Sequence, residues 1–263
     1  MTGVVYIVGA GPGAPDLLTL RAAKLLARAD IVFHDALVHP DTIALATRAE
    51  KIAVGKRCGR QSTAQKFINK RLIDAAARHG VVVRLKGGDP MLFGRAQEEI
   101  AALDAAGVRC EVVPGVTAAL AASAELGISL TQRGVARSIA FATPRVGEGE
   151  RPSDWAKSVA AADAGAIYMG AGQAEQIAAA LIGAGKPPST PVAVVENASL
   201  AEARSIFTTL AALPRLAARQ LAGPAVILIG PQYRARAEAV REVAEEDQAA
   251  VQRASGSRAE LTR

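Results

Sequence analysis

Short runs of aliphatic residues alternate along this chain with longer segments in which apolar residues recur at helical spacing. The runs Val4-Val5-Tyr6-Ile7-Val8 and Val81-Val82-Val83-Arg84-Leu85 are rich in β-branched residues and lack the polar alternation of a half-exposed strand. Between them, residues 64–79 show helical spacing and are followed by Gly80, a residue type that often ends a helix. Strands that alternate with helices in this way predict an α/β fold built on parallel sheets.

The same alternation continues through the first half of the chain. A helix is expected to begin at Leu17, with Asp16 placed to cap it, and another is expected from Phe93 onward. Further strands are expected at 31–33, 51–54 and 109–113.

Pro114-Gly115 interrupts the pattern near mid-chain, and a helix of small residues over 116–126 follows. A second series of strands is then expected at 138–142, 166–169, 192–195, 204–208 and 225–229. Near the end the apolar content falls, and Glu, Arg, Gln and Ala dominate. The sequence therefore predicts two α/β domains, 1–114 and 115–233, and a charged helical or disordered tail at 234–263.

Composition narrows the class of ligand. Half of the 263 residues are hydrophobic but only 3% are aromatic, so the core should be aliphatic and few rings are available to stack on nucleic-acid bases. The formal net charge is +6, yet Lys and Arg are dispersed among acidic residues and form no basic block. We therefore expect a small polyanionic ligand rather than a nucleic acid.

The cysteines and the apolar runs bear on compartment. Cys58 and Cys110 form no CxxC pair and lie near no histidine cluster, which predicts reduced thiols and no metal site. No apolar run approaches the roughly 20 residues of a membrane span, and the first strand begins almost at Met1 without a leader. A cytoplasmic protein that makes no membrane contact is expected.

Candidate chemistry lies where the predicted strands end. The segment Arg84-Leu85-Lys86-Gly87-Gly88-Asp89-Pro90 closes a strand with two glycines, which let a ligand approach the main chain, and with a carboxylate that accepts hydrogen bonds. Asp35 follows the strand at 31–33, and Lys56 follows the strand at 51–54. Parallel strands share one carboxyl edge, where ligands of such sheets bind, so these residues are expected at one site.

The loop Gly9-Ala10-Gly11-Pro12-Gly13 partly matches a dinucleotide-binding fingerprint. The third glycine of that pattern is replaced by Ala14, which the pattern tolerates, but Pro12 lacks an amide that a pyrophosphate would use. An NAD-dependent oxidoreductase therefore stays open as an alternative.

Six sequence blocks follow one another along the chain: Val8-Gly9-Ala10-Gly11-Pro12-Gly13, Val54-Gly55-Lys56-Arg57, Arg84-Leu85-Lys86-Gly87-Gly88-Asp89-Pro90, Phe93-Gly94-Arg95, Glu111-Val112-Val113-Pro114-Gly115-Val116-Thr117-Ala118 and Tyr168-Met169-Gly170. Taken in order, these blocks resemble the tetrapyrrole methylase superfamily over about residues 3–230, and within it the uroporphyrinogen-III C-methyltransferases. The resemblance implies two α/β domains, each a mainly parallel or mixed sheet flanked by helices, with an active-site cleft between them and a homodimeric assembly.

The activity that the resemblance implies is S-adenosylmethionine-dependent methylation of uroporphyrinogen III at C2 and then C7, giving precorrin-2 by way of precorrin-1. S-adenosylhomocysteine would be the other product, and no metal is implied. Two alternatives stay open: a methyltransferase that acts on a later precorrin, and a tetrapyrrole-binding protein without catalysis. The sequence does not fix whether the product goes to siroheme, cobalamin or heme d1.

Motif matching also implies roles for individual residues. Asp35 would be the proton acceptor and Lys56 the proton donor. Substrate carboxylates would bind Arg95 and Arg133, with Arg57 a further candidate, while Glu98 would accept hydrogen bonds from pyrrole NH groups. The implied cofactor contacts are Pro12, Gly87, Gly88, Asp89, Leu92, Thr117, Ala118, Met169 and Ala198.

Several positions depart from the family pattern. Ala198 stands where the family has a glycine, Thr131-Gln132-Arg133-Gly134 where it has Thr-His-Arg-Asp, and Thr143-Pro144-Arg145 where it has Thr-Gly-His. These departures leave the identity of the tetrapyrrole substrate open.

Overall fold

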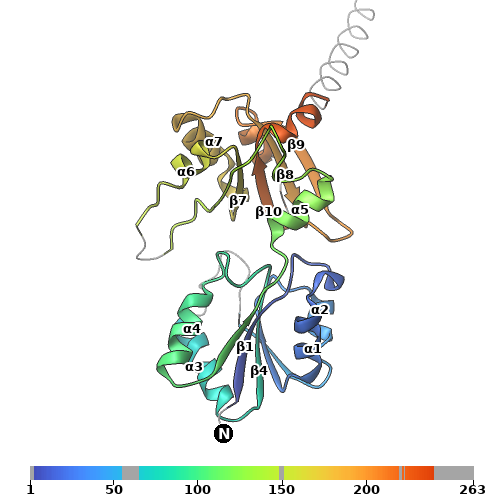
Figure 1. The fold of residues 1–263 in the computed structure, drawn as a ribbon, viewed down its shortest axis with the longest axis vertical. Helices are drawn as coiled ribbons and strands as arrows, with labels where there is room; N and C mark the ends of the chain where they lie inside the picture. Colours follow the sequence, from blue (N-terminus) through green and yellow to red (C-terminus); the bar gives the residue numbers. More distant parts are fainter. Residues whose placement is uncertain (1–2, 55–64, 148–150, 219–220, 222, 240–263) are drawn as a thin grey trace, which may run out of the picture. The chain divides into compact units, whose positions relative to one another are not determined.

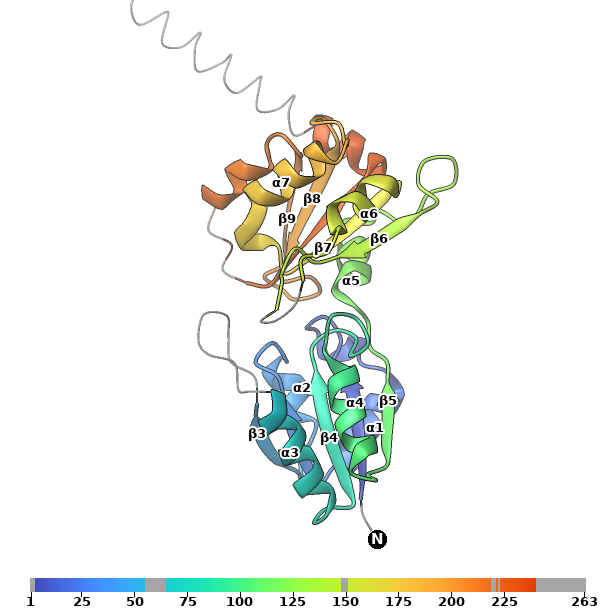
Figure 2. The same cartoon turned by 90° about the vertical axis from the view of Figure 1, so that its left-hand side faces the viewer.

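The structure is a computed structural model that describes residues 3–54, 65–147, 151–218, 221 and 223–239 (Figures 1 and 2). The described residues form two compact units. The first unit contains the chain up to Ala122 together with Asn197–Ala203, and the second contains Ser123–Glu196 and the described residues from Arg204 onward. The domain limits at 114 and 233 stay predictions of the sequence, and residues 240–263 of the expected tail lie outside the described part.

The first unit contains a parallel sheet of five described strands in the order β3-β2-β4-β1-β5. Helices α1 and α2 cover one face of this sheet, and α3 and α4 cover the other (Figure 1). The strands are β1 (Val4–Gly9), β2 (Ile31–His34), β3 (Glu50–Ala53), β4 (Val81–Lys86) and β5 (Cys110–Val113), and the helices are α1 (Leu20–Arg28), α2 (Pro40–Ala44), α3 (Gln65–Ala76) and α4 (Ala96–Ala105).

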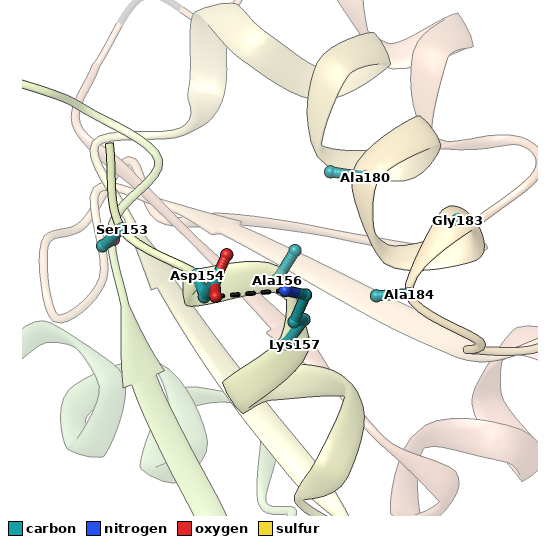
Figure 3. A pocket seen from close by; sticks show the side chains of 7 residues that line it. All are labelled: Ser153, Asp154, Ala156, Lys157, Ala180, Gly183 and Ala184. Carbon is teal, nitrogen blue, oxygen red and sulfur yellow. Dashed lines mark hydrogen bonds and ion pairs between the residues drawn. The ribbon is translucent and has the colours of Figure 1, made fainter. Parts of the chain in front are cut away.

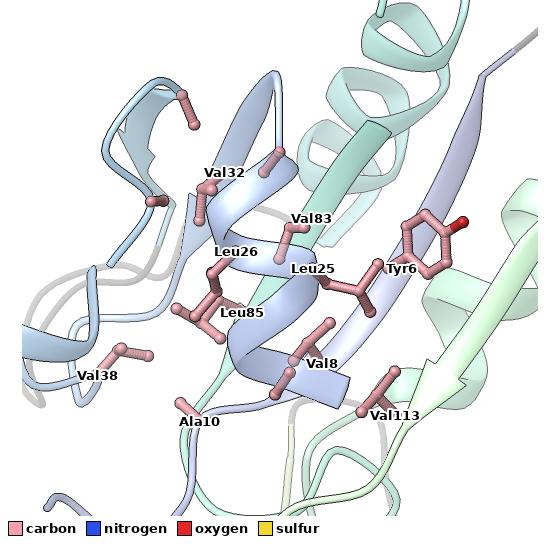
Figure 4. Close-up of a cluster of buried hydrophobic side chains, with 14 residues drawn as sticks. Tyr6, Val8, Ala10, Leu25, Leu26, Val32, Val38, Val83, Leu85 and Val113 are labelled. Atoms are coloured by element: carbon pink, nitrogen blue, oxygen red, sulfur yellow. The ribbon is translucent and has the colours of Figure 1, made fainter. Parts of the chain in front are cut away.

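Two hydrophobic cores explain why the central strands lack polar alternation. Tyr6 and Val8 of β1 point toward the core that includes Leu25 and Leu26 of α1 (Figure 4). Val5, the residue between them, belongs to the core on the other face, with residues of α3 and α4. Because successive strand residues face opposite sides, a strand covered on both faces must be apolar at nearly every position.

Helices α1 and α4 each begin three residues later than the sequence predicts. Helix α1 begins at Leu20, not Leu17, and its N-cap is Thr19, whose side chain accepts a hydrogen bond from the amide of Ala22. Asp16 was therefore the wrong cap, because it lies in the separate 3₁₀ turn η1 (Pro15–Leu17). Helix α4 begins at Ala96 rather than Phe93, because the preceding residues leave helical geometry, with φ of 54° at Phe93 and 55° at Arg95.

The second unit contains a mixed sheet of five described strands in the order β6-β7-β10-β8-β9. Among these described strands, β6 and β7 alone pair in parallel, and the other three pairings are antiparallel. The parallel arrangement expected from strand and helix alternation thus holds for the first sheet alone. The strands are β6 (Ile139–Ala142), β7 (Ala164–Tyr168), β8 (Pro191–Glu196), β9 (Arg204–Thr209) and β10 (Ala225–Ile229).

Helices α6 (Trp155–Ala161) and α7 (Ala174–Gly183) pack on the second sheet. Its core joins Val159 of α6 and Ile177 and Leu181 of α7 to strand residues such as Ile167 and Ile227. Helix α5 (Ala118–Leu126) begins in the first unit and ends in the second. None of the helices in the described segments has the length and apolar character needed to cross a bilayer.

Candidate active site

The carboxyl edge of the first sheet joins the glycine-rich loop after β1 to the turn after β4. The amide of Ala10 donates to Lys86 O at 2.7 Å, and Gly11 and Gly88 exchange two backbone hydrogen bonds of 3.2 and 2.7 Å. The amide of Ala14 is also engaged, since it donates to Ser199 Oγ at 3.1 Å. These amides serve the protein's own structure, so the loop is not the open phosphate cradle that a dinucleotide needs.

The glycines at this edge differ in whether, and why, the fold requires glycine at their positions. A Cβ at Gly9 would lie 2.6 Å from Gly115 N and 2.8 Å from Gly88 O, so glycine is needed there for close packing of main chains. Gly88 has a φ of 67°, a conformation that favours glycine. At Gly87, by contrast, an added Cβ would make only an ordinary contact, 3.5 Å from Leu37 Cβ. The packing of the first unit therefore does not itself require glycine at position 87.

Asp89 ties two segments of the predicted cofactor site together. Its Oδ1 accepts a hydrogen bond from Met91 N at 2.8 Å, and its Oδ2 accepts one from Gly115 N at 2.9 Å. Gly115 leads directly to Thr117 and to Ala118, the first residue of α5. A carboxylate has about four lone-pair sites, so Asp89 can hold both amides and still accept a donor from a ligand.

Most of the predicted cofactor residues in the first unit gather around this turn. A Cβ at Gly88 would lie 4.0 Å from Thr117 Cα, which places the two segments side by side. Ala198 is buried and belongs to the Asn197–Ala203 segment of the first unit, whose Leu200 lies near Gly13. Pro12 and Leu92 are half-buried in the loop after β1 and in the turn after β4.

Two predicted contacts belong to the second unit. Met169 follows β7 with a φ of 56° and a 43% exposed surface, and Arg133 is exposed in the turn closed by the Gln132 and Ala136 bridge. Lys56 and Arg57 lie within 55–64, outside the described residues. The predicted proton donor therefore has no structural account.

Asp35 follows β2, as predicted, and is held by the neighbouring strand. Its amide donates to Leu85 O at 3.1 Å, and its Oδ1 accepts a hydrogen bond from Arg84 Nη2. Arg84 also donates from Nε to Glu99 Oε1 at 3.0 Å, and Lys86 Nζ lies 3.1 Å from the same oxygen. We call Asp35, Arg84, Lys86 and Glu99 the charge network.

The charge network is largely buried, and the contacts among Arg84, Lys86 and Glu99 were not predicted from the sequence. Arg84 is 2% exposed, Lys86 3% and Glu99 0%. Burial lowers the pKa of Lys86, as does the adjacent positive charge of Arg84, while the carboxylates of Glu99 and Asp35 raise it. The signal in the sequence was the presence of two cations, Arg84 and Lys86, at the end of an otherwise aliphatic strand. Because charged residues are rarely buried without partners, such cations indicate buried carboxylates nearby.

Two predicted substrate residues at the start of α4, Arg95 just before the helix and Glu98 in its first turn, bind each other. Arg95 Nε donates to Glu98 Oε1 at 2.6 Å, and Arg95 Nη2 donates to Glu98 Oε2 at 2.8 Å. This hydrogen bonding lowers the pKa of the Glu98 carboxyl. A substrate carboxylate that approaches Arg95 would have to share or replace this exposed pair.

A separate hollow on the second unit contains none of the predicted site residues. It lies between the start of α6 and the end of α7, and its chief polar feature is the exposed ion pair of Asp154 and Lys157, 3.1 Å apart (Figure 3). The other residues around it are Ser153, Ala156, Ala180, Gly183 and Ala184. Within the described residues, no group of three or more His, Cys, Asp or Glu side chains could hold a metal ion.

The two units and the edge of the first sheet define an α/β protein whose candidate ligand site lies at the carboxyl ends of parallel strands. A family model described as Tetrapyrrole (Corrin/Porphyrin) Methylases matches residues 4–214. The chain belongs to this family, and the sequence-based identification of the family is confirmed.

Individual relatives agree with this membership. The siroheme synthase of Chromobacterium violaceum is 44% identical over 230 residues, which are 87% of this chain and 49% of that protein. This chain thus spans about half the length of the curated relatives it matches.

Solved structures match the fold over most of the chain. Uroporphyrin-III C-methyl transferase from Thermus thermophilus, complexed with S-adenyl homocysteine, is 39% identical with a TM-score of 0.78, covering 89% of this chain and 100% of that one. A cobalt precorrin-4 methyltransferase is 30% identical with a TM-score of 0.74, covering 86% of this chain and 94% of that one. The predicted two-domain tetrapyrrole methylase fold is confirmed.

Proposed function

We propose that this chain is an S-adenosylmethionine-dependent C-methyltransferase that converts uroporphyrinogen III to precorrin-2 by methylation at C2 and C7, by way of precorrin-1. The observation that carries the proposal is the match to the Thermus thermophilus enzyme, whose whole chain is covered and whose structure contains the demethylated cofactor. The cytoplasmic location and the homodimer remain predictions.

The edge of the first sheet fits an adenosyl amino-acid cofactor. No contact among the described residues requires glycine at position 87, which suits a main chain that a ligand approaches closely. Asp89 has acceptor capacity beyond its two backbone partners, and its neighbours Gly115 and Thr117 lie on the second segment of the site. Gly87, Gly88, Asp89, Thr117 and Ala118 would therefore hold the cofactor.

When bound, the cofactor would supply a methyl group on a positively charged sulfur, so that a pyrrole carbon can bond to the methyl carbon in line as the methyl–sulfur bond breaks and neutral S-adenosylhomocysteine leaves. The protein's main contribution is to hold the two reactants in register, since the donor is already activated. Asp35, whose side chain is 29% exposed, can stabilise the positive charge that develops on the pyrrole and accept the proton released there. Lys56 is proposed as the matching proton donor.

Uroporphyrinogen III has eight carboxylates, so its recognition needs several cations. Arg95 and Arg133 are proposed to bind them by paired, charge-assisted hydrogen bonds. Glu98 is proposed to accept from the pyrrole NH groups after Arg95 turns to the substrate.

A second candidate is methylation of a later precorrin. The similarity to the cobalt precorrin-4 methyltransferase favours it, as do the departures at Gln132, Gly134, Pro144 and Arg145. An anaerobic incubation with uroporphyrinogen III and S-adenosylmethionine, followed by mass spectrometry, separates the two. Dimethylated product supports the leading proposal, whereas methylation of precorrin substrates alone would replace it with the second. Calorimetry with S-adenosylhomocysteine and with NAD, in parallel, tests the cofactor class.

A further inference from the structure

Arg84 is fixed in place by three hydrogen bonds, one from each nitrogen of its guanidinium group. Nε donates to Glu99 Oε1 at 3.0 Å, Nη1 donates to the main-chain oxygen of Leu85 at 3.3 Å, and Nη2 donates to Asp35 Oδ1. Glu99 thus contacts one side of the planar group and Asp35 another. A lysine could not reproduce this arrangement, because its ammonium is a single point of contact.

Asp35 is the member of the charge network that a ligand can reach. Its side chain is 29% exposed, whereas those of Arg84, Lys86 and Glu99 are at most 4% exposed. Its Oδ2 accepts no hydrogen bond from any residue that the structure describes. The network therefore runs from a fully buried carboxylate on α4, through Arg84, to a carboxylate at the edge of the sheet with one oxygen available.

Stability alone is a poor explanation for this network. Removing charges from water carries a large free-energy cost, and buried ion pairs are often no more stabilising than apolar residues of similar volume. Glu99 adds to the cost, because its Oε2 is buried and has no hydrogen-bond partner among the described residues. Gln65 Nε2 and Lys86 Nζ, at 3.1 Å each, share Glu99 Oε1 with Arg84 and so hold the carboxylate on that side.

We infer that Glu99 is a positioning residue for methyl transfer, which acts by holding Arg84 so that Arg84 holds the Asp35 carboxylate in its reactive orientation. The inference rests on the proposed function in one respect, the assignment of Asp35 to the reacting tetrapyrrole. It assigns no contact with substrate to Glu99 itself. The role belongs to the catalytic step rather than to cofactor binding, since the contacts of Glu99 differ from those of the Gly87 to Asp89 turn.

A double-mutant cycle on the full chain tests this coupling. Glu99→Gln keeps the shape of the side chain and removes its charge, and Asp35→Asn removes the group on which Glu99 is inferred to act. Glu99→Gln should lower kcat by about 10-fold or more, while the Kd for S-adenosylhomocysteine changes by less than about 2-fold. In the Asp35→Asn background the same change should cost less than about 2-fold, because its target is already missing.

Two further variants serve as an independent test and as a control. Arg84→Lys keeps the charge but cannot contact both carboxylates, so it should reproduce the loss of kcat. Asp74→Asn is the matched control, because it removes a carboxylate from the exposed Lys70 and Asp74 pair on α3 and should leave kcat unchanged. Thermal unfolding of every variant shows whether it is folded at the assay temperature. If Glu99→Gln is not folded, Glu99→Asp, whose shorter side chain draws the carboxylate away from Arg84, replaces it in the cycle.

The outcomes separate this inference from the proposed function. A defective Asp35→Asn combined with an equal loss from Glu99→Gln in both backgrounds would overturn the coupling and leave the methyltransferase assignment intact. Wild-type kcat in Asp35→Asn would overturn the role of Asp35, and with it that of Glu99. The absence of any tetrapyrrole methylation by the wild-type chain would instead reject the proposed function.

Discussion

The carboxylate of Asp89 accepts a hydrogen bond from the main-chain amide of Gly115 at 2.9 Å, joining the turn after β4 to the segment after β5. Its other oxygen closes the turn through Met91 N. The residue is thus part of the scaffold of the proposed cofactor site as well as a potential ligand acceptor. Substitutions at Asp89 should act on both functions.

Asp89→Ala is expected to weaken S-adenosylhomocysteine binding by about 1 to 3 kcal/mol, because two amides and a ligand donor lose their acceptor. Asp89→Asn should lie between Ala and wild type, since the amide oxygen can replace only one of the two carboxylate oxygens. Calorimetry measures both, with Asp41→Asn, an exposed acid at the start of α2, as the control. Unchanged affinity in Asp89→Ala would argue against a cofactor at this turn.

Gly87 and Gly9 should respond to alanine in opposite ways. At Gly87 an added Cβ meets Leu37 Cβ at 3.5 Å and no other atom of the described residues within 4 Å, so Gly87→Ala should change the free energy of unfolding by less than about 1 kcal/mol while weakening cofactor binding. At Gly9 it would press on the main chain of Gly115, so Gly9→Ala should destabilise the fold by about 1 to 3 kcal/mol.

Urea unfolding and calorimetry on the two glycine variants give the comparison. If Gly9→Ala unfolds at the wild-type urea concentration, close packing of main chains does not require glycine at position 9. If the Gly87→Ala protein is stable and binds S-adenosylhomocysteine as tightly as wild type, the ligand does not approach the main chain at position 87.

The sequence predicted the first sheet well because its information is local. Val4 to Val8 and Val81 to Leu85 form β1 and β4, two neighbouring interior strands of the sheet, and burial on both faces leaves a continuous aliphatic signature. Asp35 and the Gly87 to Asp89 turn could be placed at one edge of the sheet because parallel strands end on the same side.

The parts that the sequence did not reveal depend on contacts between distant segments. Glu99 reads as an ordinary acidic residue of a helix, and its partner Arg84 becomes evident only when α4 packs against β4. Ser199 reaches Ala14 across 185 positions, although it lies between two strands of the second unit. The antiparallel pairing of β8 and β9 was likewise hidden, because strand periodicity does not encode strand direction.

Cys110 should be a slow-reacting thiol in the folded protein. Burial raises its pKa from the ordinary 9.0 to about 11, and the nearby acids Asp104, Glu99 and Glu111 act in the same direction. The folded state therefore holds the proton more tightly, so the contribution of this thiol to stability is complete below pH 9 and is lost as the pH rises through about 11.

A disulfide reagent at pH 8 measures this reactivity in a Cys58→Ser background, which leaves Cys110 as the single cysteine. The folded protein should react slower than the urea-unfolded protein by on the order of 10- to 100-fold, and its rate should keep rising above pH 9. Equal rates in the folded and unfolded states would show that the fold neither shields the Cys110 thiol from the reagent nor raises its pKa.

Arg133 offers a way to separate substrate capture from cofactor binding. It is exposed in the second unit, and in the proposed function it binds a carboxylate of uroporphyrinogen III. Arg133→Lys should raise the KM for the tetrapyrrole by an amount worth about 1 to 3 kcal/mol, because an ammonium cannot reproduce a bidentate contact. The Kd for S-adenosylhomocysteine should barely move, and kcat should also fall if this contact orients the reacting pyrrole. Steady-state kinetics with each substrate varied, together with a cofactor titration, provide the measurement. The matched control is Arg137→Lys, because Arg137 is another exposed arginine of the second unit. A collapse of cofactor affinity at an unchanged tetrapyrrole KM would assign Arg133 to the cofactor instead and refute its role in substrate capture.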